Sequence, residues 1–182
     1  MNFRQSAATR SRTGASAFTL VELLVVIAII AILMGLLFPA TQSAFNSSKK
    51  TTAKNQTVQI ATAITAYEAE YGRLPSNTTG KVDSALVNIL CSTTADTNNN
   101  PRGVLFLDSS AWKSGKGGTN SYGFCDPFNA TNVYLVALDT NYNNQITVPT
   151  NASGATATIT KHVGVWSIPK VGSTDVLINS WD

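Results

Sequence analysis

Apolar residues dominate the chain from Phe18 to Phe38, and Glu22 is the only charged side chain among them. At about 1.5 Å of rise per residue, a helix of this length covers the ~30 Å hydrocarbon core of a bilayer. We therefore predict a membrane-length helix over residues 18–38. The Glu22 carboxylate is unfavourable in such a helix, because a charged group inside a bilayer costs roughly 2.5–3.5 kcal/mol on insertion scales.

Beyond Phe38 the pattern becomes amphipathic. Buried-type residues recur at spacings of three and four, which is typical of one helix face: Ala53, Thr57, Ile60, Ala61, Ile64, Tyr67 and Tyr71. Gly72 and Pro75 then provide helix-stop signals. We predict one long helix over residues 18–71. The alternative is that Pro39 ends the apolar helix at the membrane surface, or bends it, and so separates two helices.

The region after the long helix alternates between short apolar segments and polar turns. The pattern predicts a short helix at 83–91, a strand at 104–107, a β-hairpin from strands 133–138 and 145–148, a strand at 156–168 and an edge strand at 176–178. The expected fold is α+β, with a long N-terminal helix packed on a small antiparallel β-sheet domain. The expected parts are a basic leader (1–17), an apolar helix (18–38), its amphipathic continuation (39–71) and one globular domain (72–182).

The leader holds three arginines and no acidic residue: Arg4, Arg10 and Arg12. An excess of arginine keeps its side of a membrane segment cytoplasmic, so the globular domain is expected in the periplasm or its equivalent. The formal net charge of the whole chain is +3. A chain cut after Ala17 would carry equal numbers of basic and acidic side chains. We see no basic patch in the sequence and expect no nucleic-acid partner.

Small residues lie immediately before the apolar run rather than after it, unlike in an ordinary secretory signal. Cleavage between Ala17 and Phe18 would leave the apolar helix on the mature chain. The new α-amine of Phe18 would lie about one helical turn from Glu22. Glu22 of one copy could then pair with the amine of a neighbouring copy, which relieves both buried charges.

The segment Phe18–Glu22, with Ala17 before it, resembles the N-terminus of type IV prepilins and type II secretion pseudopilins. The resemblance implies cleavage before Phe18 by a prepilin peptidase, methylation of the new amine, and a role for Glu22 in assembly. It also implies self-association into a filament, minor pseudopilins, and an inner-membrane assembly platform as partners. One departure is that the residue before the cut is usually glycine, so we expect slower processing at Ala17.

Weaker similarities continue into the domain. Tyr71–Pro75 resembles the turn after the long helix of major pseudopilins, Asp126–Asn129 resembles their Asp-Pro-Trp-Gly turn, and the stretch from Trp166 to Trp181 resembles their C-terminal segment. The leading hypothesis is a membrane-anchored major pseudopilin in a periplasmic filament. The alternatives are a type IV pilin for adhesion, motility or DNA uptake, and a tethered surface protein that never polymerises.

Calcium is the cofactor that the resemblance suggests, because the C-terminal loop of such pseudopilins binds calcium through aspartates. In this chain only Asp175 remains of those acids. A separate candidate is Asp139, Asn141 and Asn143, whose spacing matches the start of a calcium loop. That candidate lacks the bidentate carboxylate expected at its twelfth position, and an Asx-rich turn is the alternative.

The two cysteines, Cys91 and Cys125, lie in the exported part, where a disulfide can form. The alternative is two buried free thiols. The single histidine, His162, is expected on the surface of a strand. No activated serine, phosphate loop or zinc spacing accompanies it, so we do not expect an enzyme.

Overall fold

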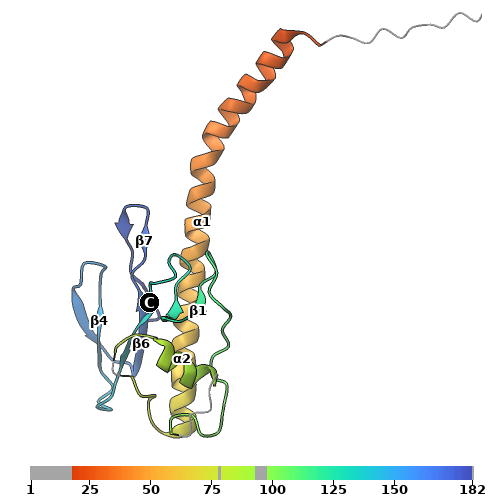
Figure 1. The fold of residues 1–182 in the computed structure, drawn as a ribbon. Helices are drawn as coiled ribbons and strands as arrows, with labels where there is room; N and C mark the ends of the chain where they lie inside the picture. The colour runs from red at the N-terminus through yellow and green to blue at the C-terminus, as the bar shows by residue number, and fades with distance from the viewer. Residues whose placement is uncertain (1–17, 78, 93–97, 182) are drawn as a thin grey trace, which may run out of the picture. The chain divides into compact units, whose positions relative to one another are not determined.

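The computed structural model describes residues 18–77, 79–92 and 98–181 (Figure 1). The chain divides after Thr41 into two compact units. The first element, α1, is a helix of 52 residues, Leu20–Tyr71. It confirms the predicted long helix. Because the helix continues through position 39, the alternative in which Pro39 separates two helices is wrong.

The C-terminal end of α1 is set by Gly72. Its φ of 67° is left-handed, a conformation that glycine adopts without steric cost. The Gly72 N–H donates to the Glu68 carbonyl oxygen at 2.8 Å, which satisfies one of the last helical carbonyls. The helix therefore ends at Tyr71, directly before the predicted stop signal Gly72.

The second helix, α2, is Ser84–Cys91. Asp83 is its N-cap, and the Asp83 Oδ1 atom accepts a hydrogen bond from the Leu86 N–H at 3.0 Å. The predicted helix at 83–91 is confirmed. The strand predicted at 104–107 is wrong. That segment is a loop whose Phe106 and Leu107 N–H groups both donate to the Leu90 carbonyl oxygen, so its hydrogen bonds serve the end of α2 instead of a sheet.

Nine short strands, all paired antiparallel, follow in the described part of the chain. They form the three-stranded sheet β3 (Leu135–Leu138), β6 (Val163–Ser167), β9 (Ile178–Asn179), and the pairs β1 (Gly118–Asn120) with β2 (Gly123–Cys125), β4 (Ile146–Pro149) with β5 (Thr156–Ile159), and β7 (Lys170–Val171) with β8 (Thr174–Asp175). With the long helix before them, these strands confirm an α+β architecture consistent with a pilin-like fold (Figure 1).

The strand pairing differs from the predicted hairpin. β3 pairs with β6, with Val136 opposite Val165, whereas β4 pairs with β5, with Val148 opposite Ala157. The cause is a break in the single strand predicted at 156–168. There the chain turns between β5 and β6, and the His162 carbonyl oxygen accepts the Asp139 N–H at 2.9 Å.

The core of the second unit is built from one face of α1, from α2 and from the three-stranded sheet. Its largest fully buried side chains include Ile60, Ile64, Tyr67, Leu86, Leu90, Tyr134 and Val165. Gly123 permits a close approach within this core, because a Cβ there would lie 2.3 Å from the Val82 carbonyl oxygen. The predicted apolar stripe of the helix is therefore the face that packs on the domain.

Candidate functional site

The apolar segment at the start of α1 is covered by nothing within its own unit. Its large hydrophobic side chains are 45–86% exposed, from Val26 at the low end to Leu20 at the high end. A contiguous apolar surface of this kind marks a membrane or protein interface. α1 is the one helix among the described residues that is long and apolar enough to cross a membrane by length and composition.

Glu22 lies at the N-terminal end of this apolar surface and closes a capping box with Thr19. The Thr19 N–H and its hydroxyl both donate to Glu22 Oε2 at 2.8 Å. In return, the Glu22 N–H donates to Thr19 Oγ1 at 3.2 Å. These reciprocal bonds satisfy orphan N–H groups at the helix start. They also fold the carboxylate back toward Phe18, where cleavage would create an α-amine.

Thr19 is a functional residue that the sequence analysis missed, although the signal was present. The residues Thr19-Leu20-Val21-Glu22 match the pattern of a capping box, a threonine followed three positions later by glutamate. From sequence alone, Glu22 was interpreted only as an ion-pair partner for the amine of another copy. In the structure the Glu22 carboxylate accepts hydrogen bonds from Thr19 of its own chain. Ala17 and the leader lie outside the described residues.

Comparison with known families is consistent with this geometry. Residues 12–38 match the family model described as the prokaryotic N-terminal methylation motif. The match spans Ala17, Phe18 and Glu22, and it supports a type IV prepilin-like precursor. The motif is shared by pilins and pseudopilins, and the match goes no further than that class. No curated protein and no solved structure matches the chain.

The predicted calcium candidate at 139–143 forms a tight polar turn. Asp139 is 2% exposed, and its two carboxylate oxygens accept the N–H groups of Asn143 at 3.1 Å and of Asn144 at 2.6 Å. Asn143 Oδ1 in turn accepts the Gln145 N–H at 3.0 Å. This is the Asx-type bonding of a turn, and Asn141 is exposed on it.

Asp175, the other candidate, lies in β8 opposite Lys170 of β7, which is a different turn from that of Asp139. Among the described residues, no group of three or more histidine, cysteine, aspartate or glutamate side chains could hold a metal ion. Calcium binding therefore stays a prediction from sequence.

His162 joins the Asp139 turn to α1. Its Nδ1 atom is buried without a hydrogen-bond partner, 3.5 Å from Asp139 Oδ2 and 3.8 Å from Glu68 Oε1. The imidazole itself is 43% exposed. The expected surface position is correct for part of the imidazole ring but wrong for its Nδ1 atom. The turn after β3 places the buried Asp139 carboxylate beside Nδ1.

Cys91 and Cys125 are free thiols in the structure, so the disulfide that the sequence left open as one alternative is not formed. Each sulfur has a separate polar neighbour. Cys125 Sγ donates to Asn120 Oδ1 at 3.5 Å, whereas Cys91 Sγ lies 3.7 Å from Ser109 Oγ. Burial raises the pKa of both thiols, which disfavours the reactive thiolate.

Proposed function

We propose that this chain is the precursor of a major pseudopilin that polymerises through its N-terminal helix into a periplasmic filament of a type II secretion system. The observation that carries the proposal is the methylation motif at residues 12–38, followed by an exposed apolar helix surface. The role is structural rather than catalytic. Before assembly the subunit is anchored in the inner membrane with its globular domain in the periplasm. It enters the filament when its N-terminal helix packs with the helices of other copies.

Processing precedes assembly in this proposal. A prepilin peptidase cuts between Ala17 and Phe18 and methylates the new amine. The remaining partners are other copies of the chain, minor pseudopilins and an inner-membrane assembly platform. The capping box supports the next step, because it already holds the Glu22 carboxylate at the helix start, where the amine of another copy would have to approach. Pairing with that amine neutralises a charge that is costly inside a bilayer.

The choice of a pseudopilin over a pilus subunit has support within the domain. Two of the weaker sequence similarities meet in space, since the Ser167 hydroxyl and the Asn132 side chain both donate to Asp126 Oδ2. Asp126 Oδ1 accepts the N–H groups of Phe128 and Asn129 at 2.9 and 3.1 Å. The Asp-Pro turn and the Trp-Ser stretch therefore form one buried network. A type IV pilin subunit is the second candidate, because the methylation motif serves both classes equally.

The decisive experiment measures the intact mass and N-terminal sequence of chain extracted from membranes that also contain a prepilin peptidase. A mature chain that begins with N-methylated Phe18 is the expected result. A chain that keeps its leader would overturn the proposal. Ala17→Gly is the matched positive control, because glycine is the usual residue there. Cleavage of that variant alone would assign the failure to Ala17 rather than to the rest of the segment.

A further inference from the structure

We propose that a cluster of five lysines on the second unit binds the anionic headgroups of the membrane that holds the apolar segment. We call it the lysine surface, and it consists of Lys49, Lys50, Lys54, Lys113 and Lys116. The sequence analysis found no basic patch, because these lysines come from two segments about sixty residues apart. The inference rests on the membrane anchoring that is part of the proposed function.

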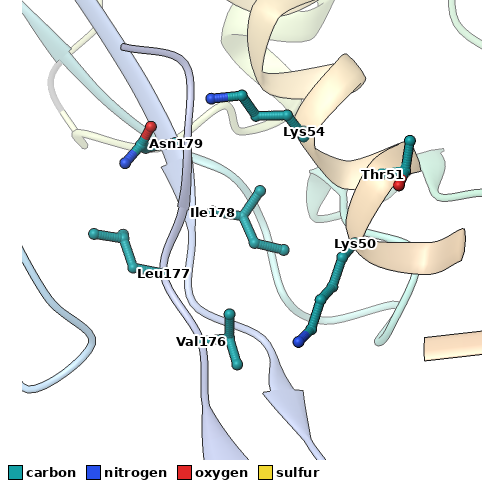
Figure 2. A pocket seen from close by; sticks show the side chains of 7 residues that line it. All are labelled: Lys50, Thr51, Lys54, Val176, Leu177, Ile178 and Asn179. Carbon is teal, nitrogen blue, oxygen red and sulfur yellow. The ribbon is translucent and has the colours of Figure 1, made fainter. Parts of the chain in front are cut away.

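Three of the lysines come from α1. Lys50 and Lys54 are one helical turn apart, and both are half-buried. Together with Thr51 they line one side of a cavity of about 370 Å³, whose other side is formed by residues 176–179. Figure 2 shows both side chains extending from the helix toward that segment. Two lysine ammonium groups and a threonine hydroxyl beside one cavity can donate hydrogen bonds to phosphate oxygens.

The other two lysines, Lys113 and Lys116, are exposed on a loop that the fold holds beside the same part of α1. The Gln56 Nε2 group donates to the Lys116 carbonyl oxygen at 2.8 Å. The Gly115 N–H donates to the Pro127 carbonyl oxygen at 2.9 Å, and a Cβ at Gly115 would lie 3.9 Å from Lys49 Cε. The loop is therefore fixed next to the helical lysines.

The helix itself contributes no carboxylate to this surface. α1 has no acidic residue between Glu22 and Glu68. Near the loop, the Asp126 carboxylate is fully buried and accepts four hydrogen bonds within the domain. Asp175 lies opposite Lys170 in the β7–β8 pair. A chain that is neutral overall after cleavage would thus carry a concentrated positive surface.

Anionic lipid is the occupant that the position of this surface favours. The lysines begin shortly after the apolar run on the helix that carries it, so anchoring keeps them near headgroups. Lysine binds phosphate as a flexible point charge without a fixed geometry, which suits a fluid lipid surface. Each lysine near an anionic membrane strengthens binding by about five-fold, and the effect fades within a Debye length.

The test uses the full chain in nanodiscs that hold one copy each, made either of phosphatidylcholine alone or of phosphatidylcholine with phosphatidylglycerol. Residue-specific acetylation rates are measured by mass spectrometry. We expect the five lysines to react several-fold more slowly in the anionic discs, and salt should remove the difference. Lys81 and Lys161, which are exposed elsewhere, are internal references that should react equally in both. One copy per disc prevents a second chain from supplying the protection.

The double variant Lys113→Gln/Lys116→Gln should lose most of the protection at the three helical lysines. The matched control, Lys81→Gln/Lys161→Gln, should keep it. Equal rates in the two kinds of disc would overturn the inference while leaving anchoring intact. A chain that fails to enter any disc would overturn both. Protection by a DNA duplex in phosphatidylcholine discs, with none from phosphatidylglycerol, would replace the lipid with a nucleic acid.

Discussion

The apolar segment and the globular unit differ in which side chains they bury and which they expose. In residues 18–38 every large hydrophobic side chain is exposed, and the one carboxylate bonds only to Thr19. In residues 42–182, by contrast, the Asp126 and Asp139 carboxylates are buried and satisfied by their own chain. The globular unit buries a hydrophobic core of its own, whereas the apolar segment needs a membrane or another copy to cover it.

This difference separates two kinds of substitution. A change in the segment should alter what the chain associates with and leave the unfolding of the globular unit unchanged. A change in the buried polar groups of the globular unit should do the reverse.

The largest effect is expected from the charge of Glu22. Glu22→Gln keeps an oxygen that can accept the Thr19 N–H, but it removes the charge that would pair with an amine. Glu22→Ala removes both. If charge pairing drives assembly, both variants should insert into membranes and be processed, yet neither should form filaments in electron micrographs. Their globular units should unfold at the wild-type denaturant concentration.

Normal filaments from Glu22→Gln would contradict charge pairing and leave the carboxylate with only its capping role. Normal filaments from Glu22→Ala would remove both roles. The phenotype is interpretable only if mass spectrometry shows that the N-terminus of each variant is cleaved and methylated as in the wild type.

Asp126→Ala should destabilise the globular unit, whereas the Glu22 variants should not. Four donors would lose their buried acceptor, including the Ser167 hydroxyl and the Phe128 N–H. Leaving such groups unsatisfied should lower the free energy of unfolding by about 3 kcal/mol or more. Chemical denaturation of the full chain in neutral detergent, followed by tryptophan fluorescence, measures this loss. Asp175→Ala is the exposed control and should change stability little, whereas an equal loss in both would refute the network's role.

The elements that the sequence predicted correctly are those specified by neighbouring residues. The long helix follows from its apolar spacing, its end from Gly72, and the short helix from the apolar residues between 85 and 90. Each of these signals acts within a few positions of the chain. Apolar spacing and the glycine stop signal therefore sufficed to predict the two helices.

The strand pairing and the lysine surface depend on distant segments, and here sequence reasoning failed. A short alternating strand does not specify its partner, so β3 was assigned to β4 although it pairs with β6. The position of the loop at residues 113–116 beside Lys49 follows from hydrogen bonds such as that from Gln56 to the Lys116 carbonyl oxygen. Neither feature has a periodic signal that a single sequence displays.

Tyr134 supplies a smaller and pH-dependent effect in the globular unit. Its hydroxyl donates to Gln56 Oε1 at 2.7 Å inside the core. Burial first, and then the nearby Asp126 carboxylate and Cys125, raise the pKa of Tyr134 well above its ordinary range. A raised folded-state pKa means that stability is full below about pH 10 and is lost as the pH rises further.

Wild-type chain should therefore show a falling free energy of unfolding above about pH 10, and Tyr134→Phe should flatten that decline. At neutral pH the variant should lose about 1 kcal/mol, because one buried hydrogen bond is removed. Denaturation curves measured across this pH range test both statements. Tyr122→Phe, an exposed control, should keep the wild-type slope. A slope unchanged in Tyr134→Phe would assign the alkaline sensitivity to other groups, such as the two cysteine thiols.

The smallest effect is expected at the helix start, from Thr19→Val. This variant keeps the Thr19 N–H bond to Glu22 but loses the hydroxyl that accepts the Glu22 N–H. A lost N-cap costs about 1 kcal/mol, so the amides of residues 20–23 should exchange about five-fold faster in detergent micelles. Thr41→Val removes a comparable hydroxyl that bonds to the Phe38 carbonyl, and it should leave those amides unchanged. Exchange that is equally fast in both variants would mean that the apolar segment frays as a whole. In that case the capping box would not hold the carboxylate in place before assembly.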